Sequence, residues 1–220
     1  MSHNYTYLDL VNGVLVRLRE DTVLTVDGND DVVVQIVKDF VNDAKNQIEN
    51  MHPWTALSQE WSLDTTDGNA KPVLTNSHSS CIIEYIYKDG GDRLEQRPKE
   101  WIRRKNRLVT DTNEPQYWCL DGIDRATGDL RLEVHPSPDG AYSYTVYGSQ
   151  PEPRLVNDTD VCYIPGLAVI YLATALAARE RGEVGGQSAG ELLGLAKQFI
   201  SDAIAQDSTN SDLENIWTTV

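Results

Sequence analysis

The residues of this chain that could act as nucleophiles or bases are few and stand apart. Nucleophilic catalysis requires a serine or cysteine beside a histidine base, which an acid then orients. The 220-residue chain holds four histidines, and none lies in a nucleophile elbow or a cysteine-protease signature (His3, His52, His78 and His135). We therefore predict no catalytic residues and no enzymatic activity.

The three cysteines favour a structural role. Cys81, Cys119 and Cys162 are odd in number, form no C-x-x-C pair, and stand among apolar or aromatic neighbours. This pattern is typical of small buried side chains in a reducing compartment.

Metal binding would draw on clustered histidines, cysteines or carboxylates. The nearest candidates, Asp121, Asp124 and Asp129, bracket a predicted hairpin, but their spacing departs from that of a calcium-binding loop. Turn chemistry explains them better, because an aspartate side chain bonds readily to the nearby backbone. The glycines at 185–190 lack the lysine of a phosphate-binding loop, and no strand precedes them. The sequence therefore predicts no metal and no cofactor.

Charge is the most unusual property of the composition. The 34 acidic and 19 basic side chains give a net charge of −15, which disfavours simple binding of nucleic acid. Residues 88–107 run against this trend, because they hold eight basic and four acidic groups. That segment carries +4 and leaves −19 for the rest of the chain.

The basic segment has two interpretations. Its cations can bind an acidic partner, either a neighbouring copy of this chain or nucleic acid. Alternatively, they lie on a solvated hairpin or short helix and bind nothing specific. The candidate partner interface consists of Arg103, Arg104, Lys105 and Arg107.

The elements that must position these residues change character along the chain. Apolar residues follow helical spacing over residues 6–19, 31–51 and 165–206. Residues 57–163 show strand alternation and turn signals instead. We therefore predict an α+β fold: a four-helix bundle formed by N- and C-terminal helix pairs, with an inserted antiparallel β-domain. The helix that follows Pro165 is apolar on almost every side and is expected to lie at the centre.

Within the inserted domain, residues 116–147 predict a three-stranded meander. Its turns are residues 125–128 and 138–140, and its last strand is expected to bury Tyr144 and Val146. The predicted boundaries are residues 1–56 for the N-terminal helical half, 57–163 for the β-domain and 164–206 for the C-terminal helical half. Residues 207–220 form a predicted extended tail.

The predicted tail is polar but ends with three apolar residues. These residues, Leu213, Ile216 and Trp217, are candidate anchors for a partner, since a buried tryptophan contributes on the order of 2–3 kcal/mol. The N-terminus lacks the basic and apolar regions of a secretory signal. The longest apolar run, 164–178, is too short to span a bilayer. We expect synthesis in a cytosol-like compartment and no contact with a membrane.

The order of these elements resembles the head-to-tail adaptor, or connector, proteins of tailed bacteriophages. The resemblance lies in four blocks spread over most of the chain: YLDLVNGVLVRL at 7–18, VNDA at 41–44, PQYW at 115–118 with the hairpin of 130–146, and the closing block 165–182 with AARERG. None of these blocks is a catalytic motif, so the resemblance points to a structural role.

The resemblance implies a homo-oligomeric ring, usually of twelve copies, in the neck between head and tail of the virion. Such a ring docks on the portal protein, presents a platform to the next tail protein, and surrounds the DNA exit channel without binding DNA specifically. It assigns no role to the basic segment. Two alternatives remain open: another tail-completion or tail-tube protein, and an enzyme of unrecognised type.

Overall fold

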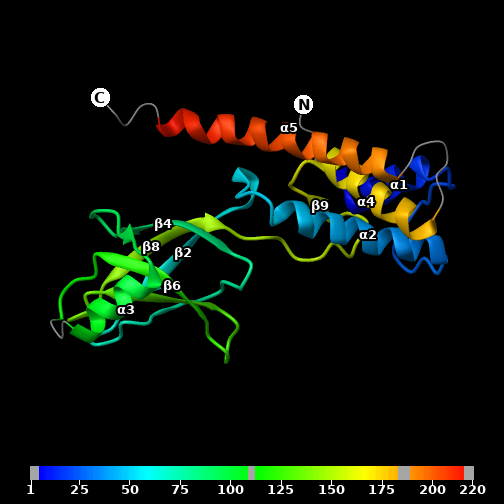
Figure 1. Ribbon diagram of the computed structural model, residues 1–220. Coiled ribbons are helices and arrows are strands. Elements are labelled where there is room, and N and C mark those ends of the chain that lie inside the picture. The colour runs from blue at the N-terminus through cyan, green and yellow to red at the C-terminus, as the bar shows by residue number, and fades with distance from the viewer. Residues whose placement is uncertain (1–4, 109–111, 183–188, 216–220) are drawn as a thin grey trace. The chain divides into compact units, whose positions relative to one another are not determined.

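The computed structural model describes the backbone of residues 5–108, 112–182 and 189–215, and the side chains of these residues except 181, 189 and 209–215. The chain forms two compact units (Figure 1). The first unit consists of Met1–Leu57 and Pro151–Val220, and the second of Ser58–Gln150. Each unit has its own buried apolar cluster.

The first unit consists mainly of helices whose ends have clear sequence signals. Thr6 and Asp9 form a capping box at the start of the first helix, and the Asp31 side chain accepts from two backbone N–H groups at the start of the second. Gly182, in the left-handed conformation at φ 60°, ends the third. The four helices are α1 (Tyr7–Arg17), α2 (Val32–Glu49), α4 (Gly166–Arg181) and α5 (Ala189–Asn215).

Helix α4 is the central helix of this unit, since it packs against α1, α2 and α5 (Figure 1). Small residues allow the close approach: a Cβ added at Gly13 of α1 would lie 2.7 Å from the Ile170 side chain. Two short strands, β1 (Tyr5–Thr6) and β9 (Val161–Cys162), pair antiparallel in the same unit.

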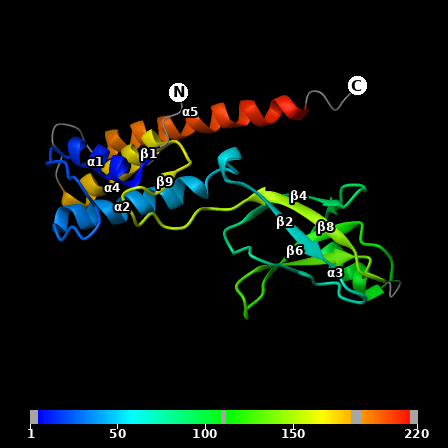
Figure 2. The same cartoon turned by 180° about the vertical axis from the view of Figure 1, so that it is seen from behind.

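The second unit contains two sheets that enclose one apolar cluster. Strand order is β2-β8-β4 in the three-stranded sheet, whose central strand β8 lies beside β2 in Figure 2. The order is β3-β7-β6-β5 in the four-stranded sheet. The strands are β2 (Ser58–Asp64), β3 (Val73–Leu74), β4 (Ile82–Lys88), β5 (Glu95–Gln96), β6 (Tyr117–Ile123), β7 (Leu130–His135) and β8 (Ser143–Ser149), and a 3₁₀ turn, η1 (Thr55–Leu57), precedes them.

Helix α3 (Lys99–Leu108) contacts β6 and β7 of the four-stranded sheet. Ile102 is its one apolar residue that is fully buried. Polar contacts must therefore make up much of the rest of this interface. In the described part of the chain, no helix is both long and apolar enough to span a membrane.

The predicted fold class is wrong in its architecture. The described residues form a mixed α+β structure of five helices and nine strands in three sheets, not a four-helix bundle with an inserted antiparallel β-domain. The fifth helix, α3, lies in the β-rich unit, and β5 pairs parallel with β6. The chain is also helical beyond residue 206, since α5 continues to Asn215. Residues 207–215 contain no glycine or proline to end the helix.

Candidate functional site

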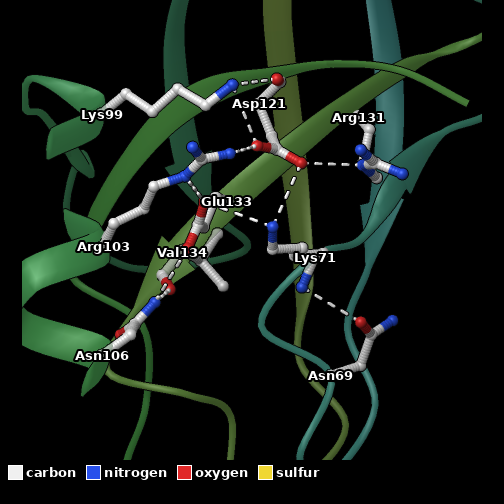
Figure 3. Close-up of polar contacts among 9 residues, drawn as sticks. All are labelled: Asn69, Lys71, Lys99, Arg103, Asn106, Asp121, Arg131, Glu133 and Val134. Carbon is white, nitrogen blue, oxygen red and sulfur yellow. Dashed lines mark hydrogen bonds and ion pairs between the residues drawn. The ribbon is translucent and has the colours of Figure 1, made fainter. Parts of the chain in front are cut away.

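A buried carboxylate with four basic partners lies between α3 and the four-stranded sheet. The side chain of Asp121, on β6, is only 1% exposed. Figure 3 shows the basic side chains that converge on its carboxylate. Its Oδ1 lies 2.7 Å from Arg103 Nη2 and 3.0 Å from Lys99 Nζ. Its Oδ2 lies 2.9 Å from Arg131 Nε and 3.3 Å from Lys71 Nζ. We refer to these residues and Glu133 as the Asp121 network.

Glu133 supplies the second carboxylate of the network. Its side chain is 5% exposed and lies 3.4 Å from Arg103 Nε and 3.6 Å from Lys71 Nζ. Asn106 Nδ2 donates to Glu133 Oε1 at 3.4 Å and to the Val134 carbonyl at 3.2 Å. Helix α3 is therefore attached to the sheet by Ile102, by the charged and polar groups around it, and by the Trp101 ring, which packs edge-on against Tyr117.

The local structure explains why these groups meet. Lys99, Ile102, Arg103 and Asn106 follow helical spacing and so share the face of α3 that contacts the sheet. On β7, alternation turns Leu132 into the apolar cluster and leaves Glu133 on the opposite face, toward α3.

The network is strongly electropositive. Burial by itself would raise the pKa of Asp121, but hydrogen bonds from the four cations outweigh this effect and hold that pKa well below its usual range. Asp121 therefore stays ionised. Four cations against two carboxylates leave two positive charges in excess. The four cations are between 37% and 51% exposed, so this excess charge reaches the surface.

The predicted interface residues separate into two groups. Arg103 belongs to the network and is held by both carboxylates. Arg104 and Arg107 are exposed and form no ion pair with a described residue. Lys105 Nζ lies over the ring of Trp101, 5.5 Å from its centroid. The predicted interface thus divides into Arg103, which holds α3 to the sheet, and three residues that form no ion pair with a described acid, Arg104, Lys105 and Arg107.

The side chains of the three predicted tail anchors lie outside the described residues. Leu213 lies on α5, but its side chain is outside the described residues, as are Ile216 and Trp217. Upstream, α5 is attached to the end of α2 through Asp207. Its carboxylate accepts from the Thr55 amide at 3.1 Å and lies 3.0 Å from His52 Nε2.

The residues considered for chemistry have structural positions. All three cysteines are buried and free, as predicted, and burial raises the pKa of each thiol, to about 12 for Cys162. Asp124 accepts a hydrogen bond from Thr127 in the β6–β7 turn, which agrees with turn chemistry. Asp121, in contrast, is a buried strand residue and no part of a turn. Among the described residues, no group of three or more metal-ligating side chains could hold an ion.

Sequence reasoning missed four members of the network: Lys71, Asp121 as a buried carboxylate, Arg131 and Glu133. A signal was present, because Arg131, Glu133 and His135 alternate with the apolar residues of β7. Buried polar groups on one face of a strand need hydrogen-bonding partners. The basic segment could therefore have been predicted to pack on this face of β7.

Comparison with curated proteins gave no match to this chain. The family model described as SU10 adaptor protein matches residues 5–215. This range includes both units, the Asp121 network and most of α5. It confirms the resemblance to phage adaptor proteins at the level of the family. The chain therefore belongs to the SU10 adaptor protein family, and it is a structural adaptor component of a phage virion.

Proposed function

We propose that this protein is the head-to-tail adaptor of a tailed phage: a ring that docks on the portal protein, links it to the next tail protein and surrounds the DNA channel. The observation that carries the proposal is the family match over residues 5–215. The resemblance adds a copy number of twelve. On this proposal the chain acts in the virion neck as a structural part and catalyses no reaction.

The charge distribution supports such a role. The first unit holds 19 acidic and 8 basic side chains, a net charge of −11, and the second holds 15 and 11, a net charge of −4. A ring with an acidic inner surface repels phosphate groups, so DNA passes through without stable contacts. Two units with separate cores also suit a protein that must contact several components at once.

The C-terminal end of α5 is the proposed portal contact. The proposed apolar anchors are Leu213 and, after the helix in sequence, Ile216 and Trp217, because a few buried apolar side chains carry most of the energy of a protein contact. The attachment of Asp207 to Thr55 fixes the helix before this segment begins.

The test is reconstitution of the neck from DNA-filled heads that lack this protein. Added wild-type chain should bind the portal vertex as a ring, visible by electron cryomicroscopy, and should restore tail attachment. A variant without residues 209–220 keeps Asp207 and should remain folded, but should no longer bind the heads. Binding to tails and not to heads would instead indicate a tail-completion or tail-tube protein and would refute the proposal.

A further inference from the structure

The outward side of α3 combines cations with one exposed apolar residue, Leu108. Trp101, Arg104, Lys105 and Leu108 follow the spacing i, i+3, i+4, i+7 and so share one face, with Arg107 beside them. We call these five residues the α3 stripe. Leu108 is 73% exposed. Helix α3 is attached to the sheet through Ile102, the Asp121 network and the Trp101 ring, which packs edge-on against Tyr117 of β6. Arg104, Arg107 and Leu108 are exposed and remain available to a partner.

The carboxylates beneath the α3 stripe do not neutralise its positive charges. The carboxylates of Asp121 and Glu133 already have four cationic partners, so the stripe stands on a network with excess positive charge. Among the described residues, Arg104 and Arg107 have no acidic partner. A stripe of this composition fits a surface that offers both carboxylates and apolar groups.

Helix α2 carries a surface with those properties. Val32, Ile36, Asp39 and Asp43 follow the spacing i, i+4, i+7, i+11 and are exposed along one side of the helix. We call these four residues the α2 stripe. Val32 is 70% and Ile36 is 41% exposed. The opposite side of α2 is buried in the core of the first unit.

The two stripes contain segments of the same length and opposite charge. The segments 36–43 and 101–108 each contain eight residues, about 10 Å of helix from the first to the last. Each has an exposed apolar residue at one end, Ile36 in α2 and Leu108 in α3, and charges in the adjoining turns, acidic in α2 and basic in α3. Asp43 has no cationic partner among the described residues, whereas Asp39 pairs with Arg154 at the surface.

We infer that the α3 stripe of one copy docks on the α2 stripe of the next copy, and that this contact forms part of the subunit interface of the ring. The inference rests on the proposed ring function. Duplex DNA is a poorer occupant for two reasons: a chain of charge −15 repels it, and phosphates offer nothing apolar to Leu108. Each copy presents both stripes, so the contact is head-to-tail and can close into a ring.

Two charge-reversed chains test the inference. The first carries Arg104→Glu and Arg107→Glu, and the second carries Asp39→Arg and Asp43→Arg. Either chain alone places like charges across every interface and should lose at least about tenfold in ring yield on the portal. An equimolar mixture places opposite charges at every interface and should restore alternating rings. A matched control, Arg93→Glu with Arg125→Glu, makes the same change of charge away from the stripe and should assemble normally.

The outcomes separate the inference from the proposed function. Normal rings from either reversed chain alone, or no recovery in the mixture, would overturn the inference and leave the adaptor role intact. If the wild-type chain forms no ring on the portal, sedimentation at high concentration still tests the contact. The two reversed chains should associate when they are mixed, and neither should associate alone. Loss of duplex DNA binding in the first variant, with normal assembly, would show that DNA is the occupant and would also overturn the inference.

Discussion

Replacing Asp121 with asparagine should destabilise the second unit strongly. The substitution keeps the shape of the side chain but removes a buried negative charge that has basic nitrogen atoms at 2.7, 2.9, 3.0 and 3.3 Å. Breaking a fully buried ion pair costs about 3–5 kcal/mol, whereas an exposed pair contributes about 0–1 kcal/mol. Here the carboxylate is buried and its partners are 37–51% exposed, so water screens part of the interaction. We expect a loss of about 2–3 kcal/mol in the free energy of unfolding at pH 7.

The pH dependence of this loss provides a second, independent check. The pKa of Asp121 is lower in the folded chain than in the unfolded chain, where it is about 3.9. The stabilisation by this group is therefore fully present above about pH 4 and is lost as the pH falls further. Below that pH, the difference between wild type and Asp121→Asn should shrink by about 1.4 kcal/mol per pH unit.

Urea unfolding monitored by hydrogen exchange distinguishes the stability of the second unit from that of the first. The amides of α3 and β6 should exchange faster in Asp121→Asn, whereas those of α2 and α4 should be unchanged. The control is Asp124→Asn, because, among the described residues, the Asp124 side chain accepts only from Thr127 in the β6–β7 turn, and its replacement should cost less than 1 kcal/mol. A loss below about 0.5 kcal/mol for Asp121→Asn, or a difference that does not change with pH, would refute the reasoning.

Three further predictions concern the framework. Gly148→Ala should cost about 3 kcal/mol by urea unfolding, because the new Cβ would lie 2.1 Å from the Ile82 carbonyl oxygen; an unchanged midpoint would contradict this. Asn42→Ala should cost a similar ~3 kcal/mol, because it leaves the buried N–H and C=O of Leu155 without their partner, and hydrogen exchange at Leu155 measures it. Burial raises the pKa of Tyr7 to about 12, so between pH 10 and 12 wild type should lose about 1.4 kcal/mol per pH unit more than Tyr7→Phe; parallel pH profiles would exclude this.

Local patterns predicted the local structure well. Helical spacing predicted a helix from residue 6, and α1 begins at Tyr7; the turn at 125–128 joins β6 to β7 as expected. Helices, strands and turns depend on residues only a few positions apart, so the local sequence is enough to predict them.

Long-range pairing could not be predicted in the same way. The third strand of the expected meander does bury Tyr144 and Val146, but β8 pairs with β2 and β4 of the other sheet and not with β7. Alternation tells which residues face the core and says nothing about which strand lies alongside. The choice depends on contacts between segments far apart in the chain, and the same holds for the parallel pairing of β5 with β6.

The basic segment shows why the candidate site was only half predictable. Arginine and lysine occur both on the face of α3 toward the sheet and on the face away from it. Composition therefore cannot distinguish a cation that stabilises the fold from one that is available to bind a partner. The helical period makes the distinction: Arg103 faces the sheet with Ile102, whereas Arg104 and Arg107 face outward. Substitution of Arg103 therefore tests mainly the attachment of α3, since it leaves two buried carboxylates short of a partner. Substitution of Arg104 and Arg107 leaves the Asp121 network intact, and so tests the docking surface alone.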